Sequence, residues 1–172
     1  MEWIKITDII LVISILILGL CAILGLIQWI SRGSIKKIDK QILWLSLPAI
    51  LLVITYLLFD KVLPEAFPDF MPTRPDGSGE PSFPSTHVMV VTTIFFCISA
   101  ALPKYTKSKT VITMLDILMF ILASLTATGR IISGKHSYID VIGAVVFSFV
   151  FYEIYYSCIH KKKKAKKDPE DE

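Results

Sequence analysis

Two short segments of the sequence contain residues that phosphoryl-transfer chemistry uses. His136 and Asp140 stand four residues apart, and at the start of a helix this spacing lets the carboxylate hold one nitrogen of the imidazole ring. The other nitrogen is then free to attack, as in the nucleophile and orienter of a catalytic triad. His87 ends the second segment and is suited to protonate a departing alkoxide. The two segments therefore predict a nucleophile, its orienting carboxylate and an acid.

Donors for phosphate oxygens stand close to these residues. Arg74, Ser85 and Arg130 supply the N–H and O–H groups that bind such oxygens. The segments around His87 and His136 each open a predicted helix, where unpaired amides and the helix dipole attract anions. We expect these residues to form one anion site.

Each residue also has a purely structural interpretation. Ser85 or Thr86 fits the N-cap of the helix that follows. Ser137 and Asp140 fit a capping box, with the aspartate at the third helical position. Lys135 fits a solvated loop charge. Taken singly, these interpretations are favoured; the whole set on one side of a membrane favours a phosphate site.

Membrane-spanning helices must position these segments. Hydrophobic residues make up 53% of the 172-residue chain, and the mean hydropathy is +0.63. A helix crosses hydrocarbon with roughly 20 apolar residues and pairs its backbone within itself. Five runs qualify, at about 9–30, 42–59, 87–103, 111–128 and 139–159. We expect an all-α polytopic bundle that forms one transmembrane domain over residues 1–160.

The basic residues predict how this bundle is oriented. Thirteen of the 18 Lys and Arg residues lie in segments 32–40, 104–109 and 161–167. Basic residues in short loops stay cytoplasmic, so we expect the tail 161–172 inside and the N-terminus outside the cell membrane. Loops 60–86 and 129–138 then face outward. The net charge of +3 is a topology signal, with contact to anionic lipid as a lesser role, and does not indicate nucleic-acid binding.

These segments resemble the type 2 phosphatidic acid phosphatase superfamily, which includes lipid phosphate phosphatases, glucose-6-phosphatase and vanadium haloperoxidases. Its signatures are Lys-x6-Arg-Pro, Pro-Ser-Gly-His and Ser-Arg-x5-His-x3-Asp. The first survives here as Arg74-Pro75, and the second appears as Pro84-Ser85-Thr86-His87. The third appears as Gly129-Arg130, then His136 and Asp140, followed by Gly143. The resemblance extends from about residue 60 to residue 143.

The resemblance implies a mechanism. His136 attacks phosphorus and forms a phosphohistidine, and Asp140 orients it. His87 protonates the leaving group and then activates water. No metal or other cofactor is required. By the resemblance, Arg74, Ser85 and Arg130 are expected to bind the phosphate, and we expect Thr86 and Lys135 to contribute.

Three positions depart from the signatures. Phe67 stands where the family has lysine, Thr86 replaces glycine, and Gly129 replaces serine. Members usually have six spans, one more than predicted here. Because a dianionic phosphate needs compensating charge, Lys135 beside the nucleophile is the favoured substitute cation, ahead of Lys61.

We therefore expect an integral membrane phosphatase that hydrolyses lipid phosphates or diphosphates at the bilayer surface. Phosphatidic acid, phosphatidylglycerol phosphate and a polyprenyl diphosphate such as undecaprenyl diphosphate all fit as substrates, with membrane lipids around them. The outer loops contain no cluster of carboxylates or cysteines with metal-ligand spacing, which also predicts metal independence. Two alternatives stay open: a lipid phosphotransferase, and a non-catalytic lipid-binding protein of the same fold.

Overall fold

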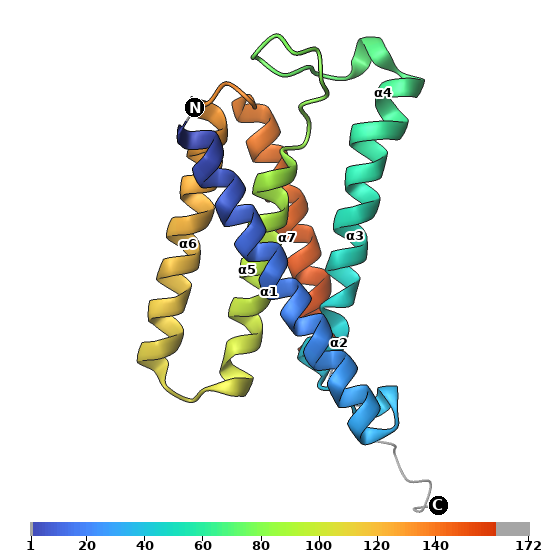
Figure 1. The fold of residues 1–172 in the computed structure, drawn as a ribbon, viewed down its shortest axis with the longest axis vertical. Coiled ribbons are helices and arrows are strands. Elements are labelled where there is room, and N and C mark those ends of the chain that lie inside the picture. The colour runs from blue at the N-terminus through green and yellow to red at the C-terminus, as the bar shows by residue number, and fades with distance from the viewer. Residues whose placement is uncertain (1, 161–172) are drawn as a thin grey trace, which may run out of the picture.

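The computed structural model describes residues 2–160, which fold as a bundle of helices (Figure 1). Five segments are long and apolar enough to cross a membrane. They are α1 (Glu2–Arg32), the segment Lys40–Ala66, α5 (Thr86–Tyr105), α6 (Lys109–Ile132) and α7 (Tyr138–His160). The predicted all-α bundle with five spans is confirmed. The predicted tail 161–172 lies outside the described residues.

Helix α5 forms the centre of the bundle. Its Val88, Met89, Val91 and Cys97 side chains are fully buried, and α1, α6 and α7 all pack against it. Figure 1 shows α1 crossing α5 and α7 diagonally, with α6 and α3 (Ser46–Leu57) at the two edges. Apolar side chains cover α1 on all sides, and many of them remain exposed, as expected for a lipid-facing helix.

The segments that carry the predicted site meet at one end of this bundle. The N-terminal end of α1, the loop 67–85 and the turn between α6 and α7 lie together in Figure 1, while α7 ends at the opposite end. The fold thus brings the two sequence segments to the same end.

Helix α1 begins seven residues before the predicted start at Ile9. The hydroxyl of Thr7 donates to the carbonyl of Ile4 at 2.9 Å, so this polar residue is satisfied within the helix. Thr7 is fully buried. The extension carries Asp8, which the apolar run did not include.

The second span is also longer than predicted, because residues 60–66 of the predicted outer loop are helical. After α2 (Lys40–Trp44) and α3, a π-helical turn (Leu58–Val62) leads into α4 (Leu63–Ala66). Pro64 lies at the start of α4, directly after this π-helical turn. The irregular loop therefore begins at Phe67, with only a 3-10 turn (Pro68–Phe70) in it.

Candidate active site

The N-terminal ends of α5 and α7 are joined directly. The backbone N–H of Ser85 donates to the carbonyl of Asp140 at 3.1 Å. One helical turn further along α5, the hydroxyl of Ser148 donates to the carbonyl of Met89 at 3.0 Å. These bonds hold the two predicted segments, 53 residues apart from His87 to Asp140, in one fixed arrangement.

A short hairpin in the loop 67–85 places Arg74 over these helix ends. The N–H of Arg74 donates to the carbonyl of Glu80 at 2.9 Å, and the guanidinium also forms an ion pair with the Glu80 carboxylate. Gly77 and Gly79 close the hairpin with φ angles of 77° and 73°, a region that favours glycine. These two glycines thus make the turn that returns the chain to the site.

The ring of His136 is held by a backbone carbonyl. Its Nδ1 lies 2.9 Å from the carbonyl oxygen of Ser82, while the nearest Asp140 oxygen is 3.8 Å away. A carbonyl only accepts, so Nδ1 carries the proton and Nε2 keeps its lone pair. The orienting group in direct contact is therefore Ser82, not the aspartate that the spacing favoured.

Asp140 supports His136 through Ser82. Its carboxylate accepts hydrogen bonds from the Ser82 hydroxyl at 3.2 Å and from the Ser137 N–H at 2.7 Å. The Ser137 hydroxyl accepts in return from the Asp140 N–H at 3.4 Å, which completes the capping box. Asp140 is fully buried, so one carboxylate both caps α7 and fixes the serine that orients His136.

Three buried donors around this site have no partner among residues 2–160. They are the Ser85 hydroxyl, Nε of Arg74 and Nε of Arg130. Ser85 occupies the N-cap position of α5, yet its side chain makes no capping bond, so the structural interpretation does not account for its hydroxyl. Buried donors normally find acceptors, and a phosphate group supplies them.

Both arginines line a cavity of about 200 Å³, and Ser85 stands between Pro84 and Thr86, which line it as well. Of the eight predicted site residues, five line it: Arg74, Thr86, His87, Arg130 and His136. Tyr56, Phe59 and Asp60 of the second span line its other side. The cavity is thus bounded by two cations and two histidines on one side and by the end of a membrane-spanning segment on the other.

Lys135 does not line this cavity. Its Nζ binds the Asp76 carboxylate at 2.6 Å, and this hydrogen bond lowers the pKa of Asp76. Lys61 pairs with Asp60 at 3.1 Å, and Phe67 is exposed. Lys135 therefore ties the hairpin tip to the α6–α7 turn, and within residues 2–160 no lysine lines the cavity in place of the missing one.

Asp8 is a site residue that the sequence did not predict. Its Oδ1 lies 2.9 Å from Nε2 of His87 and 3.4 Å from Nη1 of Arg130. The available signal was weak, because a single aspartate at the edge of an apolar run usually marks only the end of a span. Ser82 was missed as well, since no spacing rule links an irregular loop to a helix start 58 residues away.

Burial sets the charge of His136. Desolvation, helped by the positive charge of Arg130, lowers the pKa of His136 from its usual 6.5 to about 4. The neutral ring, the form that can attack, therefore persists well below neutral pH. No group of three or more His, Cys, Asp or Glu residues that could hold a metal occurs within residues 2–160.

This shift predicts an unusual pH profile. If His136 is the nucleophile, kcat/KM should fall on the acid side with a midpoint near pH 4, because only then does the ring become protonated. The measurement is kcat/KM from pH 3.5 to 8, corrected for the separately titrated phosphate of the substrate. A corrected midpoint near 6.5 would contradict the assignment of that limb to a buried His136.

Comparisons with known proteins identify the fold and the family. A crystal structure of a transmembrane PAP2-type phosphatidylglycerolphosphate phosphatase from Bacillus subtilis is similar, with a TM-score of 0.61 and 23% identity. The alignment covers 96% of this chain and 81% of that chain. Among curated proteins, none matches the sequence. The family model of the PAP2 superfamily matches residues 18–164. The chain therefore belongs to the PAP2 superfamily, the family that its segments resemble.

Proposed function

We propose that this protein is an integral membrane phosphatase that hydrolyses lipid phosphate or diphosphate esters through a phosphohistidine at His136. Membership of the PAP2 superfamily supports a lipid phosphatase at the level of the superfamily. The observation that carries the proposal is the pair of buried, unpaired Nε donors of Arg74 and Arg130 at the cavity that His136 lines, with the unpaired Ser85 hydroxyl between two residues that line it, Pro84 and Thr86. Thr86 lines the same cavity and adds a hydroxyl at the start of α5.

In the first step, Nε2 of His136 attacks phosphorus and the bond from phosphorus to the lipid oxygen breaks. His87 gives its proton to the departing oxygen, so the lipid leaves as an alcohol or a monophosphate. Arg74 and Arg130 bind the equatorial oxygens, where negative charge accumulates. The product of this step is a phosphorylated His136.

In the second step, water attacks the phosphohistidine and the P–N bond breaks. His87, now neutral, takes a proton from the water, and inorganic phosphate leaves. Asp140 and Ser82 keep the proton of His136 on Nδ1 throughout, so the same nitrogen attacks in each cycle. On the distribution of basic residues we place this end of the bundle on the extracytoplasmic side.

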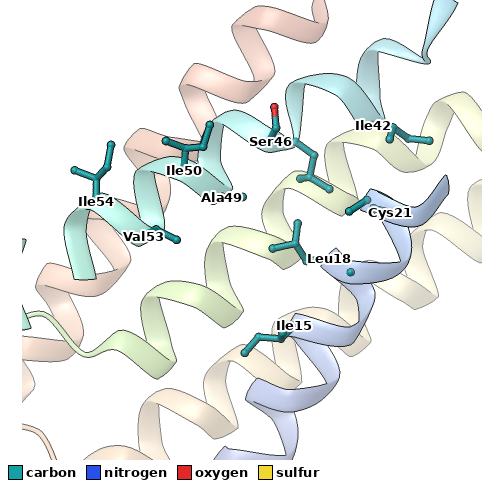
Figure 2. Close-up of a pocket in the computed structure, with 12 residues that line it drawn as sticks. Ile15, Leu18, Cys21, Ile42, Ser46, Ala49, Ile50, Val53 and Ile54 are labelled. Carbon is teal, nitrogen blue, oxygen red and sulfur yellow. The ribbon is translucent and has the colours of Figure 1, made fainter. Parts of the chain in front are cut away.

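An apolar groove between α1 and α3 supports a lipid substrate. It has a volume of about 590 Å³ and is lined mostly by apolar residues, most of them from these two helices. Figure 2 shows Val53 on α3 and Leu18 on α1, the two helices that border the groove. From residue 46 to residue 54 the groove follows α3 for about 12 Å at 1.5 Å per residue.

The groove leads toward the polar cavity. Val53 lines the groove, and Tyr56, one helical turn closer to the outer end of α3, lines the cavity. We propose that the hydrocarbon chain of the substrate lies in this groove while its phosphate lies between Arg74 and Arg130.

The proposed function is tested by phosphate release from the purified protein in detergent. Phosphatidic acid, phosphatidylglycerol phosphate and undecaprenyl diphosphate form the panel, with and without chelator. Release that persists in chelator, together with an acid-labile, alkali-stable phosphoprotein, is expected. Transfer of label to a second lipid would mean a phosphotransferase, and no release from any lipid would mean a non-catalytic protein. Activity that depends on added Mg²⁺ would contradict the metal-free mechanism.

Filling the groove should affect only substrates with long chains. In Val53→Trp, the indole ring is expected to narrow the groove and lower kcat/KM for a long-chain phosphate at least about tenfold, or about 1.4 kcal/mol. A water-soluble aryl phosphate should be cleaved at the wild-type rate. Val146→Trp is the matched control, because Val146 is equally exposed, at 57% against 58%, on a different helix. Wild-type kinetics on the long-chain phosphate would place the chain elsewhere, and equal losses on both substrates would mean damage to the site rather than to a chain-binding groove.

A further inference from the structure

We propose that Asp8 of α1 is a positioning residue of the same site, which holds the His87 imidazole so that Nδ1 delivers the proton to the leaving group. This inference rests on the proposed function. It assigns a role to a carboxylate from outside the segments that carry the superfamily's signatures.

The first support is the pair of contacts that Asp8 makes. One oxygen, Oδ1, serves both Nε2 of His87 at 2.9 Å and Nη1 of Arg130 at 3.4 Å. His87 and Arg130 line the cavity, whereas Asp8 does not. The carboxylate therefore supports two cavity residues without occupying the position of the phosphate.

The second support is the close packing of α1 on α6 beside Asp8, whose own side chain is half exposed. Thr7 precedes Asp8 on α1, and Gly129 precedes Arg130 on α6. A Cβ atom at position 129 would lie 2.7 Å from Cγ2 of Thr7, so the two helices are in close contact here. Trp3 also lies 3.2 Å from that position. Only glycine admits this approach, so Gly129 lets α1 bring Asp8 to Arg130.

The contact with His87 determines which ring nitrogen can act as the acid. A carboxylate accepts and does not donate, so Nε2 of His87 carries a proton and donates it in the hydrogen bond to Asp8. Nδ1 is the remaining nitrogen, and it gives its proton to the leaving oxygen. His87 is then neutral, with its proton on Nε2, and Nδ1 takes a proton from the attacking water. Atoms and charge balance over the cycle.

The test is Asp8→Asn, which keeps the shape of the side chain and removes its charge. With a lipid alkyl phosphate, whose leaving group needs a proton, kcat should fall at least about tenfold. With an aryl phosphate, whose leaving group needs little protonation, kcat should stay within about threefold, and inhibition by inorganic phosphate should not change. Glu2→Gln, which makes the same change of charge on the same helix, should behave as wild type.

A second comparison separates positioning from damage to the fold. In the double variant Asp8→Asn/His87→Gln, the loss on the alkyl phosphate should equal that of His87→Gln alone, because both changes remove one function. Additive losses, equal losses on both substrates, or tighter inhibition by inorganic phosphate without a loss of kcat would overturn the inference. An inactive wild type would overturn the proposed function together with it, whereas an active wild type with an unaltered Asp8→Asn would overturn this inference alone.

Discussion

His136→Ala is expected to abolish turnover, with a loss of at least about 10⁴-fold in kcat on every substrate, as removal of a nucleophile produces in other enzymes. The reason is local. His136 is buried at 5% exposure, and its ring is held by the Ser82 carbonyl with Nε2 free. The other histidine that lines the cavity, His87, is paired with Asp8 through Nε2 and is assigned to proton transfer. The measurement is phosphate release together with trapping of the phosphoprotein, which should disappear as well.

The matched control for this change is His160→Ala. His160 ends α7 at the other end of the bundle and stacks on Tyr156 with ring centroids 4.0 Å apart, so it reports the cost of losing any histidine. It should retain wild-type kinetics. A His136→Ala protein that still forms the phosphoprotein would mean that another residue is the nucleophile.

His87→Ala is expected to have the second-largest effect, and its size should depend on the substrate. General acid catalysis contributes about 10²–10⁴-fold, so a loss in this range is expected on a lipid alkyl phosphate. An aryl phosphate with a good leaving group should lose far less in the phosphorylation step. The measurement is the rate of phenol release in a single turnover, which isolates that step from the attack of water. Equal losses on both substrates would remove His87 from the role of acid.

The main elements could be predicted because the bilayer imposes simple rules. A run of about 20 apolar residues has few alternatives to a spanning helix, and five such helices are present. That His87, Arg130 and His136 lie close together was also predictable, since helix ends at one side of a membrane must lie within one thin layer. Five of the eight predicted site residues line one cavity for this reason.

The remaining parts depend on contacts that local patterns do not contain. The spacing of His136 and Asp140 correctly indicated proximity, but the preferred partner of the ring is a carbonyl in an irregular loop. Lys135 is next to His136 in the sequence, but its side chain binds Asp76 in the hairpin and does not line the cavity. A side chain next to a nucleophile in sequence need not face the same cavity.

The long sequence separation of these contacts has a consequence for biosynthesis. Asp8 pairs with partners 79 and 122 residues later in the chain. The Ser82 hydroxyl likewise donates to Asp140, which is 58 residues later. Contacts between distant residues form only when the later segment is present. During translation, α1 therefore enters the membrane with its carboxylate unpaired, and His136 has no support until the start of α7 has followed. A nascent chain that carries only the first four spans should accordingly be inert toward the lipids around it, and activity should begin only when the fifth span has been inserted.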